Sequence, residues 1–164
     1  MMSKKKILIS ACLLEERVRY DGKISPNCPA ILKEWMEKGW VVPVCPEVAG
    51  GLPIPRPSAE IHMGDGNDVV AGTAKVINIS GKDVTQAFLT GAREALWLAE
   101  GHGIVCALLK ARSPSCGSKM IYDGSFSGML KAGQGVTAAL LESASIRVYS
   151  EDEIERVASL IGVD

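Results

Sequence analysis

Three of the five cysteines lie just past segments that the sequence predicts to be buried strands. Cys12 directly follows the first segment, 4–11, Cys45 directly follows the second, 40–44, and Cys116 lies in the loop after the third, 104–109. Because the carboxyl ends of parallel strands meet at one edge of a sheet, we expect the three thiols to converge there. Soft thiolate ligands at such an edge suit an iron–sulfur cluster or zinc.

The number of thiols indicates which of these metal centres fits better. Three thiolates fit a cubane [4Fe-4S] cluster that keeps one iron without a protein ligand, and an open iron implies chemistry on a substrate. A structural zinc ion would need a fourth ligand, which His62 could supply. The competing interpretation is that free cysteines are small apolar residues. We assign that role to Cys106, inside a predicted strand, and leave open the role of Cys28, at a predicted helix start.

Two charged residues after Cys45 could take part in the chemistry. Glu47 is a candidate catalytic residue, a general acid or base at the sheet edge, and the alternative is an ordinary solvated loop glutamate. Arg56, between two prolines, is a candidate substrate ligand that could bind a carbonyl or an anion. It could equally brace its own loop through Glu60.

Two serines stand just before Cys116. Ser113 is a candidate catalytic hydroxyl and Ser115 a candidate substrate ligand, because hydroxyls so placed can hydrogen-bond a cluster sulfide or polarise a substrate carbonyl. Serines in turns often satisfy only the local backbone, which is the alternative.

The elements that must position these residues alternate along the chain between strand and helix. Continuous apolar segments predict strands at 4–11, 40–44, 104–109 and 146–149. Helical spacing of apolar residues predicts helices at 27–39, 83–100 and 135–143, and a capping box at 150–153 opens a last one. This order predicts an α/β fold, Rossmann-like, with a mostly parallel sheet and helices on both faces.

One stretch departs from this alternation. Residues 46–72 are rich in Gly and Pro, have little periodicity, and are predicted to form a long loop. Residues 73–79 alternate like a strand, so we expect an added strand or hairpin there, beside the main sheet.

Length and charge limit the class of protein. With 164 residues and 47% hydrophobic residues, the chain suits one domain over residues 1–164. Its formal net charge of -1 argues against a nucleic-acid partner or an anionic membrane surface. The basic N-terminus precedes an apolar run too short for a secretory signal, and no segment reaches the length of a membrane span. We therefore expect a cytoplasmic protein with reduced cysteines.

Motifs spread over nearly the whole chain carry a family resemblance: Cys12, Tyr20-Asp21-Gly22, Val44-Cys45-Pro46-Glu47, Gly50-Gly51-Leu52, Pro55-Arg56, Glu60, Lys110, Ser113-Pro114-Ser115-Cys116-Gly117 and Gly124-Ser125-Phe126-Ser127-Gly128. In this order they resemble a bacterial family once labelled only as a domain of unknown function, to which the thiouracil desulfidases belong. The resemblance implies a [4Fe-4S] cluster bound by three cysteines, which map onto Cys12, Cys45 and Cys116.

The resemblance also implies an activity, the non-redox desulfuration of a thiolated pyrimidine with release of hydrosulfide. The substrate would be a small thiolated nucleobase such as 2- or 4-thiouracil, with Glu47 as proton carrier and Ser113 as hydrogen-bond donor. Two alternatives stay open: a sulfur transferase that uses the same open iron, and a metal-binding structural or sensor protein without turnover. A thiol-based redox protein ranks last, because the sequence lacks a Cys-x-x-Cys motif.

Overall fold

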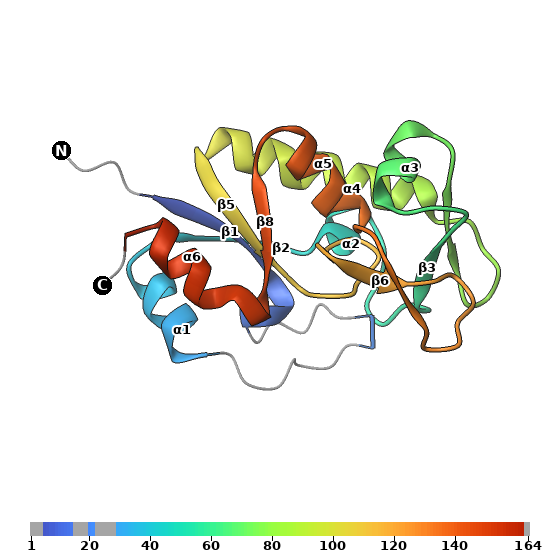
Figure 1. The fold of residues 1–164 in the computed structure, drawn as a ribbon, viewed down its shortest axis with the longest axis horizontal. Coiled ribbons are helices and arrows are strands. Elements are labelled where there is room, and N and C mark those ends of the chain that lie inside the picture. The colour runs from blue at the N-terminus through green and yellow to red at the C-terminus, as the bar shows by residue number, and fades with distance from the viewer. Residues whose placement is uncertain (1–4, 15–19, 22–28, 163–164) are drawn as a thin grey trace.

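Four parallel strands in the order β2-β1-β5-β8 form the central sheet (Figure 1). The computed structural model describes residues 5–14, 20–21 and 29–162 of the chain. The strands are β1 (Lys6–Ser10), β2 (Val41–Val44), β5 (Ile104–Leu109) and β8 (Arg147–Ser150). All four coincide with predicted segments to within two residues, because strands buried on both faces are largely apolar.

Helices cover both faces of this sheet, as the alternating pattern predicted. On one face Ile7 and Ile9 of β1 share a core cluster with Trp35 of α1 (Ala30–Glu37) and Val157 of α6 (Ile154–Leu160). On the other face Leu8 belongs to the cluster covered by α4 (Thr85–Gly101) and α5 (Val136–Ser143). Successive residues of β1 therefore pack into two separate cores, one on each face of the sheet, which confirms the α/β class.

The predicted capping box is also confirmed. Ser150 Oγ accepts a hydrogen bond from the backbone N–H of Asp152 at 3.3 Å, and the Glu153 carboxylate accepts one from the backbone N–H of Ser150 at 3.2 Å. The box opens the short 3-10 helix η2 (Glu151–Glu153), which leads into α6. The start of the helix predicted at 27–39 lies outside the described residues, as does Cys28.

The prediction of one long loop at 46–72 is wrong. The structure places α2 (Pro46–Ala49), β3 (Ala59–His62) and α3 (Gly66–Ala71) in this stretch. Each of these elements has only four to six residues, which is too short for a periodic apolar pattern to be recognised in the sequence.

The strand predicted at 73–79 is β4 (Lys75–Asn78), which pairs antiparallel with β3 in a sheet of its own instead of joining the central sheet. A second small pair consists of β6 (Met120–Tyr122) and β7 (Leu130–Ala132). Both pairs and α3 lie beyond the carboxyl ends of the central strands (Figure 1). Their core, which includes Ile61, Val76 and Ile121, is continuous with Phe88 of α4.

The strand order places a crevice at the carboxyl ends of β1 and β5. The chain runs from β1 outward to β2 on one side and from β5 outward to β8 on the other. Such a reversal point leaves space between the two departing connections, and ligands of open α/β sheets bind there.

Candidate active site

A cavity of about 510 Å³ occupies the crevice at the carboxyl ends of the central strands. Every candidate site residue lines this cavity: Cys12, Cys45, Glu47, Arg56, Ser113, Ser115 and Cys116. These residues come from three segments that are more than a hundred positions apart at their extremes. The fold therefore brings together the whole set that the sequence singled out.

The three cysteines reach the cavity on three different local structures. Cys12 lies in η1 (Ala11–Leu14), the 3-10 turn that follows β1, and Cys45 is the N-cap residue of α2. Cys116 lies in a turn of the loop after β5, where its backbone N–H donates to Ser113 Oγ at 2.7 Å. Cys106 is buried inside β5, is not among the described residues that line the cavity, and has the core role predicted for it.

The thiols are held in an environment that disfavours their ionisation in the metal-free protein. Burial is the main cause that raises the pKa of Cys12 to about 12, that of Cys116 to about 11, and that of Cys45 above its ordinary value. The charges of Cys116 and Cys45 raise the pKa of Cys12 further, so the three thiolates are close enough to repel one another. A nearby cationic metal would favour the thiolates that this pocket disfavours.

The described residues do not form a site for a single metal ion. Among them, no group of three or more His, Cys, Asp or Glu side chains is arranged to hold one ion. His62 packs against Phe126, with ring centroids 6.0 Å apart, and is not among the described cavity residues. A structural zinc site with His62 as fourth ligand is therefore not supported. A multi-iron cluster has no such requirement, because each thiolate binds a different iron atom.

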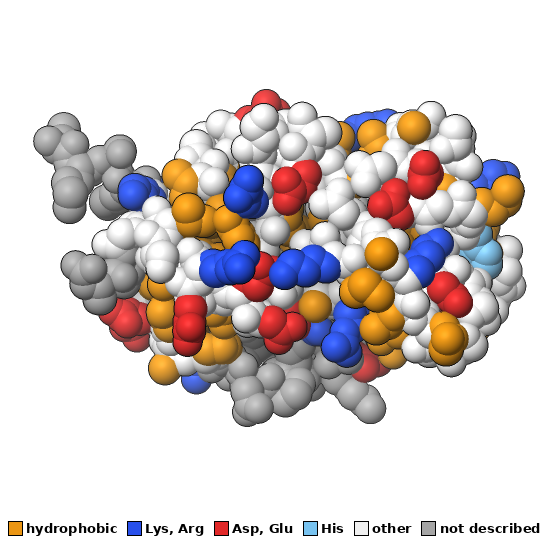
Figure 2. Space-filling view, viewed as in Figure 1, with side chains coloured by type: hydrophobic (Ala, Val, Ile, Leu, Met, Phe, Trp, Pro, Cys, Tyr) orange, Lys and Arg blue, Asp and Glu red, His pale blue; other side chains and the backbone are white. Residues whose placement is uncertain are grey.

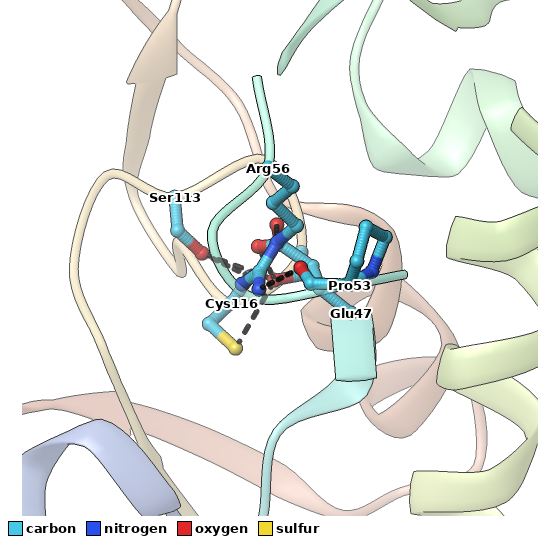
Figure 3. Close-up of polar contacts among 6 residues, drawn as sticks. Glu47, Pro53, Arg56, Ser113 and Cys116 are labelled. Carbon is cyan, nitrogen blue, oxygen red and sulfur yellow. Dashed lines mark hydrogen bonds and ion pairs between the residues drawn. The ribbon is translucent and has the colours of Figure 1, made fainter. Parts of the chain in front are cut away.

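The Glu47 carboxylate contacts Arg56, as Figure 3 shows, and its other oxygen contacts Ser115. Arg56 Nε donates to Glu47 Oε1 at 3.0 Å, and Ser115 Oγ donates to Glu47 Oε2 at 3.1 Å. Arg56 Nη1 also donates to the Pro53 carbonyl at 3.1 Å, and Ser115 Oγ lies 3.2 Å from Ser113 Oγ. With its side chain only 16% exposed, Glu47 is not a solvated loop residue.

Close packing between two helices places Glu47 in this network. A Cβ added at Gly91 of α4 would overlap the backbone carbonyl of Pro46, and one added at Gly50 would overlap the carbonyl of Ala87. The two glycines thus allow the backbones of α2 and α4 to touch. Because α4 packs against the central sheet, this contact fixes α2, and with it Glu47, relative to the cysteines.

Two further residues support the cysteines: Ser10, which the sequence analysis did not name, and Lys110, which it named as a motif residue without giving it a role. Ser10, the last residue of β1, lies with its Oγ 3.5 Å from Cys116 Sγ, and the same oxygen accepts the backbone N–H of Lys110 at 2.9 Å. Lys110 lines the cavity, forms an ion pair with Glu151 at 2.7 Å, and lowers the pKa of Cys12 through its charge. In the sequence, the only indication of a role for Ser10 was its position at the end of a predicted apolar strand.

The surface around these elements has no single sign of charge on the face in view. Figure 2 shows Lys and Arg side chains interspersed with Asp and Glu side chains there. None of the helices in the described parts of the chain is long and apolar enough to cross a bilayer.

Known proteins resemble this chain over nearly its whole length. A family model described as 2-thiouracil desulfurase matches residues 7–153. The protein YbbK of Bacillus subtilis (strain 168), whose name calls it uncharacterized, is 43% identical over 151 residues, which cover 92% of this chain and 99% of YbbK. The solved structure of the [4Fe-4S]-dependent thiouracil desulfidase TudS is similar with a TM-score of 0.88 and 45% identity, over 97% of this chain and 99% of that one.

Proposed function

Because the chain belongs to the 2-thiouracil desulfurase family, we propose that it removes the sulfur of a thiolated pyrimidine such as 2- or 4-thiouracil, using a [4Fe-4S] cluster. One observation carries this proposal: the three thiols of the predicted ligands, the Glu47 carboxylate and the hydroxyls of Ser113 and Ser115 line the same cavity. A cavity of about 510 Å³ is in the size range of small-molecule sites and has room for a single pyrimidine ring.

The donor set fits such a cluster. Cys12, Cys45 and Cys116 would hold it, and three thiolate ligands leave one iron of four without a protein ligand. The hydroxyls of Ser10 and Ser115 lie 3.5 Å and 3.4 Å from Cys116 Sγ, where they can donate to a metal-bound thiolate. Such hydrogen bonds to ligand sulfur stabilise its negative charge.

When bound, the cluster supplies Lewis acidity from its open iron, which suits the soft sulfur of a thiocarbonyl and favours attack of water at carbon with release of hydrosulfide. Glu47 accepts a proton from the attacking water and returns one to the departing sulfur. The overall reaction consumes one water and needs no electrons, since the carbonyl oxygen of the product comes from that water.

The two serines connect Glu47 to the substrate. The Ser113 hydroxyl accepts the Cys116 backbone N–H at 2.7 Å, so its own proton is available for a substrate heteroatom or for Ser115. Ser115 has one proton and two acceptors in reach, Glu47 Oε2 and Cys116 Sγ. The chain from Ser113 through Ser115 to Glu47 is thus a path along which protons move.

Arg56 orients the carboxylate in this scheme. Its guanidinium donates both to Glu47 and to the Pro53 carbonyl, and these two contacts hold Glu47 Oε1 in place. Direct contact of Arg56 or Ser115 with the substrate stays a prediction.

Anaerobic reconstitution tests the proposal. The protein is loaded with iron and sulfide, both are quantified, and 4-thiouracil is added while sulfide and uracil are measured. We expect about four iron atoms per chain and stoichiometric sulfide and uracil. Cys116→Ala should lose iron and activity, whereas the matched variant Cys106→Ala, which alters a buried cysteine outside the cavity, should keep both.

Two other outcomes of this experiment would contradict parts of the proposal. A bound cluster without turnover would refute the desulfuration and favour sulfur transfer or sensing. Equal iron content in Cys116→Ala and the wild type would refute the assignment of the ligands.

A further inference from the structure

Phe126 occupies an unusual position on the wall of the cavity. It lines the cavity and has a φ of 56°, in the left-handed region that residues with a Cβ rarely adopt. The conformation is unfavourable by itself for a residue with a Cβ, so the surrounding structure must hold it.

Glu60 of β3 holds the backbone of Phe126 in this conformation. Its Oε1 accepts hydrogen bonds from the backbone N–H of Gly124 at 2.9 Å and of Phe126 at 3.1 Å. Glu60 is only 8% exposed, and of these two charge-assisted bonds the one from Gly124 is buried and the one from Phe126 is partly buried. Gly124 has a φ of 98°, and a Cβ there would come within 2.8 Å of the Ile61 carbonyl. The turn that contains Gly124 and Phe126 therefore packs directly against β3.

The ring of Phe126 is also supported by a second ring. The imidazole of His62 lies next to it, with centroids 6.0 Å apart and ring planes inclined by 45°. The ring that lines the cavity is therefore fixed both through its backbone and through its neighbour.

Beyond the proposed desulfuration, on which this step rests, we propose that Phe126 is the apolar surface on which the pyrimidine ring of the substrate lies, with Glu60 as the residue that positions it. The cysteines, Glu47 and the serines act on the sulfur and the protons but offer no face to a planar ring. Of the described aromatic residues that line the cavity, Tyr20, Tyr122 and Phe126, only Phe126 has a wholly apolar ring. Stacking on an aromatic side chain is favourable for any nucleobase. Phe126 would therefore hold the ring while Glu47 and the serines act on its thiocarbonyl group.

Holoenzyme kinetics with 4-thiouracil test the assignment through the separation of KM from kcat. Phe126→Ala should raise KM about tenfold and change kcat less than twofold, because the ring transfers no proton. Phe126→Tyr, which keeps the ring, should stay near the wild type. Met129→Ala, on the same hairpin but 62% exposed and not among the described cavity residues, is the control and should change neither constant.

Glu60 variants separate positioning from a general loss of structure. Glu60→Ala should reproduce the KM increase of Phe126→Ala, and the double variant should show little further change, since both act through one ring. Glu60→Gln retains an acceptor oxygen for the two N–H groups and should restore most of the affinity. Iron content should be unchanged in all of these variants.

Equilibrium dialysis of labelled uracil with the cluster-loaded protein provides a readout that does not depend on turnover. Uracil lacks the sulfur, so its binding reports contacts to the ring, and Phe126→Ala should weaken it about tenfold. Equal uracil binding by wild type and Phe126→Ala, or an unchanged KM, would overturn the inference. If the wild type binds uracil through Phe126 but releases no sulfide from 4-thiouracil, the ring site stands and the proposed reaction fails.

Discussion

Replacing Arg56 with methionine is expected to destabilise the protein by about 3 kcal/mol, because it leaves the Glu47 carboxylate buried without its cation. The two side chains are 4% and 16% exposed, and Nε lies 3.0 Å from Oε1. For charge centres about 4 Å apart, an effective dielectric constant of about 20 gives an attraction of about 4 kcal/mol, part of which offsets the cost of desolvation. In a chain of this length, a loss of 3 kcal/mol lowers Tm by about 6–12 °C.

A double-mutant cycle measures this pair directly. Urea unfolding of the metal-free protein under reducing conditions would compare Arg56→Met, Glu47→Gln and the double variant, so that bound metal adds nothing to the stability. We expect the double variant to lose only about 1 kcal/mol, well below the sum of the losses in the two single variants, because removing both partners leaves no unpaired charge.

An exposed ion pair serves as the matched control. Lys38 Nζ and Glu34 Oε1 are 2.9 Å apart, with side chains 42% and 54% exposed, and Glu34→Gln should cost less than about 0.5 kcal/mol. If the effects of Arg56→Met and Glu47→Gln simply add, or if Arg56→Met costs no more than the control, then Arg56 does not hold Glu47 and the account of the site is wrong.

Three further predictions concern other parts of the structure. Burial raises the pKa of Asp65, but hydrogen bonds to its carboxylate outweigh that effect and lower it below 3.8. Asp65→Ala should therefore cost about 1 kcal/mol at neutral pH, and unfolding curves should show the difference vanish as pH falls through the lowered folded-state pKa. In the metal-free protein the pKa of Cys12 is about 12 against an ordinary 9.0, so peptide mapping after iodoacetamide treatment should show labelling about 1000-fold slower than in an unfolded peptide; equal rates would contradict the burial. Gly91→Ala should force α4 away from Pro46 and cost more than about 2 kcal/mol in thermal unfolding, whereas Gly101→Ala, with open space around it, should be neutral or stabilising; similar effects of both would refute the close contact.

Much of the fold was predictable because its central elements have strong local patterns. The four strands of the sheet have mostly apolar centres, and the helices have helical spacing and recognisable ends, as with the capping box at Ser150. Residues 46–72 were not predictable, because α2, β3 and α3 are short and are stabilised by contacts with distant residues. The contact between Gly50 and the backbone of α4 is an example, since neither partner reveals it in the sequence.

The α/β class, the family and seven of the residues that line the cavity could be predicted from the amino-acid sequence alone. The cysteines after strand ends already indicated where the site lies, because parallel strands deliver their carboxyl ends to one edge whatever the details of packing. The contacts that each of these side chains makes could be learned only from the three-dimensional arrangement. The sequence around Arg56 was compatible with binding to an anion, to a carbonyl or to Glu60, whereas the structure pairs Arg56 with Glu47. Hydrogen bonds are directional and act over about 3 Å, so they depend on backbone positions set by packing across the whole chain.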